Sequence, residues 1–110
     1  MPAPLPDPVF MEAFPSYDGS GWVDVGRLLT FSEAVLHRLA GGSVVVCGDD
    51  HKTNKDLGWS VESGVGPASR VQLPHKGSAG PHALPHYHQL SRVPRGHTFY
   101  EVPPKLRARR

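Results

Sequence analysis

The chain has 110 residues, a length that suits one domain and is too short for two. Glycine and proline number 12 each and hydrophobic residues make up 38%, so we expect long loops around a small core. A net charge of +2 does not by itself indicate a nucleic-acid partner, the one cysteine excludes an internal disulfide, and no apolar run is long enough for a transmembrane helix.

The first 21 residues are predicted to form a proline-rich arm or linker. Five prolines lie between Met1 and Pro15, and proline removes backbone donors and fixes φ. The N-terminus also lacks a basic region followed by an apolar one, so it does not resemble a secretory signal, and we expect a cytoplasmic protein. We predict a single domain over residues 22–103 and a basic tail over residues 104–110.

The clearest predicted element is a helix over residues 31–40. Thr30 and Glu33 have the spacing of a capping box, and Ser32 is an alternative cap. Two glycines follow the last turn, as is common at helix ends. An apolar stripe at helical spacing consists of Phe31, Ala34, Val35, Leu36 and Leu39.

Four strands are predicted from β-branched or alternating runs, at residues 43–47, 57–62, 69–73 and 97–102. A helix followed by strands suggests the α+β class. We therefore expect one main helix packed on a small, mostly antiparallel four-stranded sheet.

The basic residues gather in the last third of the chain. From residue 76 onward, Glu101 is the only acid. This distribution favours a polyanionic partner, although the final residues could equally form a solvated tail. The basic residues in this part are Lys76, Arg92, Arg95, Lys105, Arg107, Arg109 and Arg110.

Histidines are the residues most able to carry chemistry here. Of the seven in the chain, five lie at positions 75, 82, 86, 88 and 97. Imidazole titrates near neutral pH, so such a cluster suggests either acid–base catalysis or metal binding. The plainer alternative is that proline-flanked histidines are solvated loop residues and that the neighbouring aromatic residues belong to the core.

A metal site is the less favoured of the two chemical interpretations. His86 and His88 would lie on the same side of an extended chain, and His82 or His97 could supply a third ligand. The segment has no recognised ligand spacing and no obvious carboxylate ligand, so we predict no metal and no cofactor.

Metal-independent RNA cleavage is the favoured interpretation. It needs a base for the ribose 2′-hydroxyl, an acid for the leaving oxygen and cations at the phosphate. His86 and His97 are the candidate acid–base pair, with Thr98 and Tyr100 as candidate hydrogen-bond donors. Trp59 is a further candidate for stacking on a base. The candidate substrate-binding residues are His75, Lys76, Ser78, Tyr87, His88, Arg92 and Arg95.

The blocks at residues 71–88 and 96–100 resemble the C-terminal toxin modules of bacterial polymorphic toxins, found at the ends of Rhs-repeat and contact-dependent inhibition proteins. Both combine proline, glycine and histidine and end in a histidine-bearing strand. The resemblance implies a metal-free ribonuclease of the barnase, colicin and RelE type, with a nuclease site on the sheet. It also implies an immunity protein as partner and delivery to a target-cell cytoplasm within a longer secreted toxin. A histidine-ligated metal-binding module and a non-catalytic interaction domain remain the alternatives.

Overall fold

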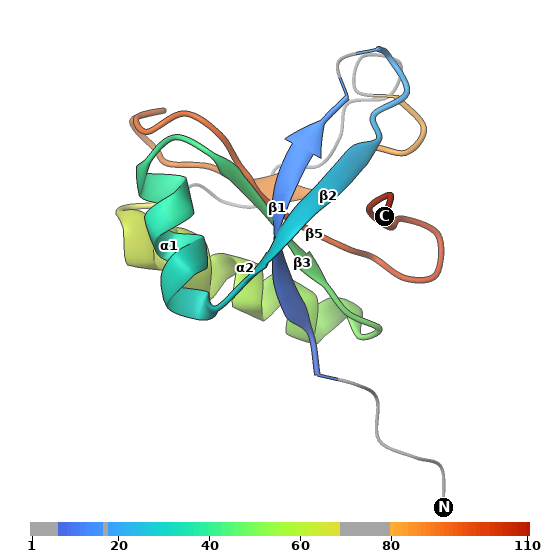
Figure 1. The fold of residues 1–110 in the computed structure, drawn as a ribbon, viewed down its shortest axis with the longest axis horizontal. Coiled ribbons are helices and arrows are strands. Elements are labelled where there is room, and N and C mark those ends of the chain that lie inside the picture. The colour runs from blue at the N-terminus through green and yellow to red at the C-terminus, as the bar shows by residue number, and fades with distance from the viewer. Residues whose placement is uncertain (1–6, 17, 69–79) are drawn as a thin grey trace, which may run out of the picture.

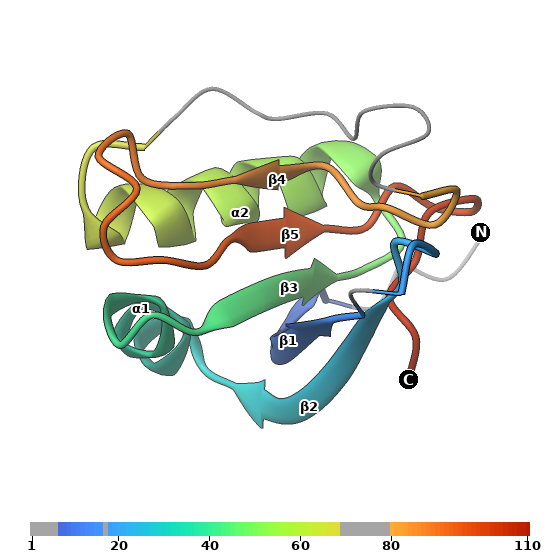
Figure 2. The ribbon, with the colours of Figure 1, turned by 90° about the horizontal axis from the view of Figure 1, so that it is seen from above.

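A computed structural model describes residues 7–16, 18–68 and 80–110. The strands that it describes form one five-stranded sheet in the order β2-β1-β3-β5-β4 (Figure 2). Strands β3 and β5 are parallel, and the other neighbouring pairs are antiparallel. The predicted α+β class is confirmed, while the described residues form a mixed sheet of five strands and two helices instead of one. In chain order the elements are β1 (Val9–Pro15), β2 (Val23–Leu29), α1 (Phe31–Leu39), β3 (Ser43–Cys47), α2 (His51–Val65), β4 (His86–Tyr87) and β5 (Thr98–Tyr100).

Both helices pack against the same face of the sheet. Val44 of β3 belongs to one apolar cluster with Ala34 of α1 and Val61 of α2. Val46, two residues further along β3, packs on the same side with Tyr100. Figure 1 shows α1 and α2 side by side on this face. None of the described helices has both the length and the apolar character that spanning a bilayer requires.

The opposite face has its own apolar core, made by the alternate residues of the same strands. Val45 and Phe99 lie here, because successive side chains of a strand point to opposite faces. Leu84 and Ala108 cover them. The C-terminal segment therefore lies across the sheet from the helices (Figure 1).

Helix α1 begins as the sequence predicts. Thr30 Oγ1 accepts a hydrogen bond from the Glu33 backbone N–H at 3.2 Å, and the Glu33 carboxylate accepts one from the Thr30 N–H at 2.9 Å. The capping box is thus confirmed and the alternative start at Ser32 is not used. The helix ends at Leu39, one residue before the predicted end.

The predicted strand at residues 57–62 is wrong, because this segment belongs to α2. The Asp50 side chain caps the helix by accepting from the Thr53 N–H at 2.9 Å and from the Thr53 hydroxyl at 2.6 Å. The residues that α2 buries recur at intervals of three or four, which places them on one face of a helix, whereas one face of a strand would need intervals of two. They are Asn54, Gly58, Val61 and Glu62.

The proline-rich arm predicted for residues 1–21 is also corrected over much of its length. Val9–Pro15 forms β1, which is an inner strand paired with both β2 and β3. Strand β2 was not predicted at all. Pro15 ends β1 at the hairpin, where a missing backbone donor is tolerated. The folded domain therefore includes residues from at least Val9, before the predicted start at residue 22.

The basic tail predicted for residues 104–110 is part of the fold. The backbone of Arg109 pairs with the backbone of β2, and its guanidinium binds the Asp24 carboxylate at 2.5 and 3.1 Å. The Arg110 guanidinium binds the buried Glu101 carboxylate at 2.9 Å. Both arginines are therefore tied to the domain by ion pairs, and the tail is not simply solvated.

The remaining strand predictions have mixed outcomes. The strand at residues 43–47 is confirmed as β3. The strand predicted at residues 97–102 is shorter, because β5 covers Thr98–Tyr100 alone. The strand predicted at residues 69–73 lies outside the described residues.

Candidate active site

His97 lies at the point where the chain enters β5. Its backbone N–H donates to the Ser43 hydroxyl at 3.1 Å, and its carbonyl accepts from the Val44 N–H at 3.0 Å. Both partners belong to the start of β3, an inner strand. The backbone of His97 is therefore held by the centre of the sheet even though the residue itself lies in a loop.

Three histidines gather around this position. His86 on β4 pairs in register with Phe99 of β5, so its ring lies 4.4 Å from the His97 ring, centroid to centroid. His88 follows two residues later, and its ring centroid lies 6.2 Å from that of His97. The Nδ1 atom of His88 lies 2.8 Å from the Gln89 carbonyl oxygen. The predicted proximity of His86, His88 and His97 is thus present in the structure.

A pocket of about 330 Å³ opens beside two of these rings. His88 and His97 line it, whereas His86 does not. Arg92 and Arg95 also line it, and both are exposed residues of the loop between β4 and β5. Among the described residues no acidic side chain lines this pocket, so its electrostatic character favours an anion. The described residues that line it are His88, Arg92, Pro94, Arg95, Gly96 and His97.

Burial and neighbouring groups disfavour protonation of His97 and His86. Burial lowers the pKa of His97 to about 4, with further lowering by the nearby His86, Arg38, His88 and Arg92. Burial also lowers the pKa of His86, against an opposing hydrogen bond to the Leu84 carbonyl. His97 is therefore neutral at pH 7 and able to accept a proton. Its Nδ1 atom is buried and has no hydrogen-bond partner among the described residues.

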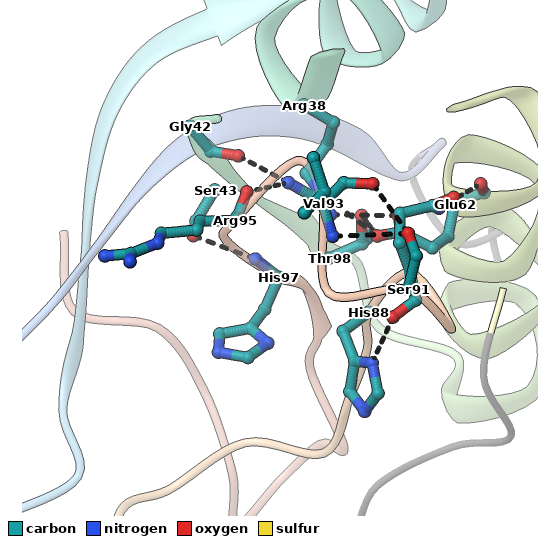
Figure 3. Close-up of polar contacts among 11 residues, drawn as sticks. Arg38, Gly42, Ser43, Glu62, His88, Ser91, Val93, Arg95, His97 and Thr98 are labelled. Carbon is teal, nitrogen blue, oxygen red and sulfur yellow. Dashed lines mark hydrogen bonds and ion pairs between the residues drawn. The ribbon is translucent and has the colours of Figure 1, made fainter. Parts of the chain in front are cut away.

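A buried polar network lies on the other side of these strands (Figure 3). The Arg38 guanidinium and the Glu62 carboxylate, both 0% exposed, form a two-pronged ion pair with distances of 3.0 and 2.9 Å. Arg38 also donates to the Gly42 carbonyl at 3.0 Å and to the Arg95 carbonyl at 2.7 Å. Figure 3 shows the His88 and His97 rings pointing away from this network.

Two residues predicted to be catalytic lie on the helix side of the sheet, away from the pocket. Thr98 is completely buried, and its hydroxyl donates to the Glu62 carboxylate at 2.9 Å. Tyr100 packs with Val46 in the core beneath α2, and burial raises the pKa of its hydroxyl to about 12. Neither side chain is among those that line the pocket.

The predicted substrate-binding residues divide into three groups. His88, Arg92 and Arg95 line the pocket. Tyr87 is buried on the helix side, where Trp59 packs edge-on against it at 5.4 Å between ring centroids. The third group lies outside the described residues and consists of His75, Lys76 and Ser78.

Three residues that support the site were not predicted from the sequence, namely Arg38, Glu62 and Gln89. Arg38 belongs to no sequence motif, and Glu62 lies in the segment that was predicted to be a strand. The one available signal was the spacing of Asn54, Gly58 and Glu62 at intervals of four, which places them on one helix face.

The described part of the chain contains no ligand set for a metal centre. Within residues 7–16, 18–68 and 80–110, no group of three or more histidine, cysteine, aspartate or glutamate side chains is placed to hold a metal ion. Cys47 is buried and burial raises the pKa of its thiol to about 12, so it is a poor thiolate ligand.

Comparisons with known proteins provide no relative for this chain. No family model, no curated protein and no solved structure matches it.

Proposed function

We propose that the protein is a small ribonuclease that cleaves RNA by metal-independent acid–base transesterification. One observation carries the proposal: two histidines and two arginines line one pocket from which, among the described residues, acidic side chains are absent. Phosphodiester cleavage needs this combination of proton-transfer groups and cations around a single anion.

In the proposed reaction His97 is the base. Its pKa of about 4 keeps it neutral at pH 7, and in this form its ring nitrogen takes the proton from the ribose 2′-hydroxyl. The 2′-oxygen then forms a bond to phosphorus, and the bond from phosphorus to the 5′-oxygen breaks. A protonated histidine across the pocket gives its proton to the departing 5′-oxygen, which leaves a 2′,3′-cyclic phosphate and a 5′-hydroxyl.

We assign the acid to His88 and not to His86, which the sequence had suggested. A phosphate between acid and base needs space, and the rings of His86 and His97 are only 4.4 Å apart. His88 lines the pocket together with His97, and their ring centroids are 6.2 Å apart. His86 then lies beside the proposed base and has no proton-transfer role of its own.

Arg92 and Arg95 are the proposed phosphate ligands. Guanidinium groups bind phosphate oxygens through two parallel hydrogen bonds and remain charged at any relevant pH. They would neutralise the charge that develops on the phosphoryl oxygens as the 2′-oxygen attacks. In a toxin module of the kind that the sequence resembles, the same two cations would be the natural contacts for an acidic immunity protein.

The test uses the purified protein with a fluorescent single-stranded oligoribonucleotide in excess chelator. We expect cleavage products that end in a 2′,3′-cyclic phosphate and no cleavage of the same sequence as DNA. His97→Ala and His88→Ala are expected to lose about 10²–10⁴-fold in rate, the usual contribution of a single acid or base. His51→Ala, which removes an exposed histidine at the start of α2, is the matched control and keeps wild-type activity.

Three results would each contradict the proposal. Cleavage of the DNA oligonucleotide would exclude the 2′-hydroxyl as nucleophile. Loss of activity in the chelator would favour the metal-binding alternative. Full activity of His97→Ala would remove the proposed base.

A further inference from the structure

The buried ion pair between Arg38 and Glu62 joins four separate parts of the chain. Arg38 lies in α1 and Glu62 in α2, and both are 0% exposed. Gln89, just after β4, donates to the Glu62 carboxylate and to its backbone carbonyl. Thr98 of β5 donates to the same carboxylate at 2.9 Å. Buried ion pairs contribute little net stability compared with apolar residues of similar size, so stability alone does not explain this one.

The hydrogen bonds of this network hold the two residues that directly follow the pocket histidines in the sequence. Gln89 follows His88, and Thr98 follows His97. Because successive side chains of an extended chain point to opposite faces, holding Gln89 and Thr98 on one face directs the two rings to the other. Figure 3 shows this arrangement, with the network on one side and the rings on the other.

The guanidinium of Arg38 also holds the loop that carries the pocket arginines. Its Nη1 donates to the Arg95 carbonyl at 2.7 Å and to the Gly42 carbonyl at 3.0 Å. Gly96 permits this approach, because a Cβ atom there would lie 2.9 Å from the Arg38 Nη1 and 2.7 Å from the Gly42 oxygen. The backbone of Arg95 is therefore fixed to the end of α1.

We propose that Arg38 and Glu62 are positioning residues that set the distance between His88 and His97 and the place of Arg95 at the pocket. One carboxylate, through Gln89 and Thr98, holds the residues next to both histidines, and one guanidinium holds the backbone of the arginine. The consequence for catalysis rests on the proposed ribonuclease function, whereas the consequence for phosphate binding and for the His97 ring does not.

Arg38→Lys is the most informative variant. Lysine keeps the positive charge beside Glu62, but its ammonium cannot reproduce the planar fork that reaches a carboxylate and two backbone carbonyls at once. Arg27→Lys is the matched control, because Arg27 forms an ion pair with Glu33 at 3.2 Å in which both side chains are largely exposed. Thr98→Val is the milder second variant, since it removes one hydrogen bond to Glu62 and leaves the ion pair in place.

The experiment follows the His88 and His97 ring signals by NMR while inorganic phosphate is added and while pH is varied, and in parallel measures kcat and KM on the oligoribonucleotide. In wild type we expect phosphate to shift both rings. In Arg38→Lys we expect phosphate affinity to fall about 10-fold or more and kcat to fall on the order of 10²-fold, as displaced catalytic groups do. The His97 titration should also move up from its lowered pKa, as its surroundings of His86, His88, Arg38 and Arg92 rearrange.

Arg27→Lys should leave all of these quantities unchanged, and Thr98→Val should change them in the same direction by a smaller factor. If Arg38→Lys does not fold, the same criteria apply to Thr98→Val. A folded variant with wild-type phosphate affinity and wild-type His97 titration would show that the network only stabilises the fold. Absence of a phosphate response in wild type would also overturn the proposal, because there would be no anion pocket to position. Loss of phosphate binding in Arg38→Lys, with no RNA cleavage by either protein, would support the positioning role and reject the ribonuclease.

Discussion

Acidification is expected to destabilise the protein through His97. In the unfolded chain a histidine has a pKa near 6.5, whereas burial lowers the pKa of His97 in the folded protein to about 4. Between these values the unfolded state binds the extra proton more readily, so the free energy of unfolding falls as pH decreases from about 6.5 to about 4. Above that range neither state is protonated and the effect is absent, and below it the loss is complete.

The size of the effect follows from the difference between the two pKa values. A difference of about 2.5 corresponds to at most about 3 kcal/mol. The ring is only partly buried and solvent screens its charge, so we expect about 1–2 kcal/mol. For a small domain with a total stability of about 5–15 kcal/mol, a loss of that size is readily measured.

Urea unfolding of wild type and His97→Gln over this pH range tests the prediction. The variant lacks the titrating ring but retains His86, whose pKa burial also lowers, so only the His97 contribution should disappear. The pH-dependent loss should therefore be smaller in His97→Gln by about 1–2 kcal/mol. His51→Gln, which changes an exposed histidine, should follow wild type. Equal losses in wild type and His97→Gln would refute the assignment of a buried, neutral His97.

Two glycine substitutions have opposite expected signs. Gly58→Ala should stabilise the protein by about 0.5–1 kcal/mol, because alanine favours the helix interior and its Cβ would lie at ordinary contact distance, 3.6 Å, from Tyr87 and Tyr100; urea unfolding that shows destabilisation would contradict this. Gly96→Ala should lower the free energy of unfolding by about 1–3 kcal/mol, because the φ of Gly96 is +99° and the added Cβ would lie 2.7 Å from the Gly42 carbonyl oxygen. An unchanged midpoint of urea unfolding would contradict this and show that the loop moves freely.

Local signals in the sequence were sufficient for part of the fold. The capping box of Thr30 and Glu33 satisfies helix-end groups with residues three apart, so α1 could be predicted from a short window. The run of β-branched residues at 43–47 is similarly local and predicted β3 correctly. Strand β1 was missed because the prolines around it outweighed the apolar residues Phe10, Met11 and Ala13 between Pro8 and Pro15.

Helix α2 shows how a short apparent alternation can mislead. Residues 56–62 alternate well enough for a strand, yet the buried positions are set by packing under the sheet, with Gly58 against the rings of Tyr87 and Tyr100. Those two tyrosines lie about thirty and forty residues further along the chain. No local pattern contains that contact, so the tertiary structure overrides the local preference.

The histidine cluster and the network that supports it also differ in how much of each could be predicted from the sequence. Alternation places His86 and His88 on one side of an extended chain, as their spacing predicted, whereas the register of β4 against β5 that brings His86 beside His97 was not predicted. The network beneath the cluster could not be predicted, because Arg38 lies 24 positions from Glu62 and 57 positions from Arg95. A guanidinium of α1 has no sequence feature that identifies the loop carbonyl it will bind.

Near the edge of the sheet formed by β5 and β4, the two faces of the sheet therefore have different roles in the proposed chemistry. On the helix face, Glu62 and Arg38 satisfy buried polar groups and fix the backbone of the loop. On the other face, two imidazoles meet the exposed arginines of the pocket. An acid and a base must keep their separation while water and substrate exchange around them, and surface loops alone rarely provide that rigidity. Since His88 and His97 are each one residue away from a side chain held by the same carboxylate, we propose that the separation of the two rings is set inside the core and not at the surface.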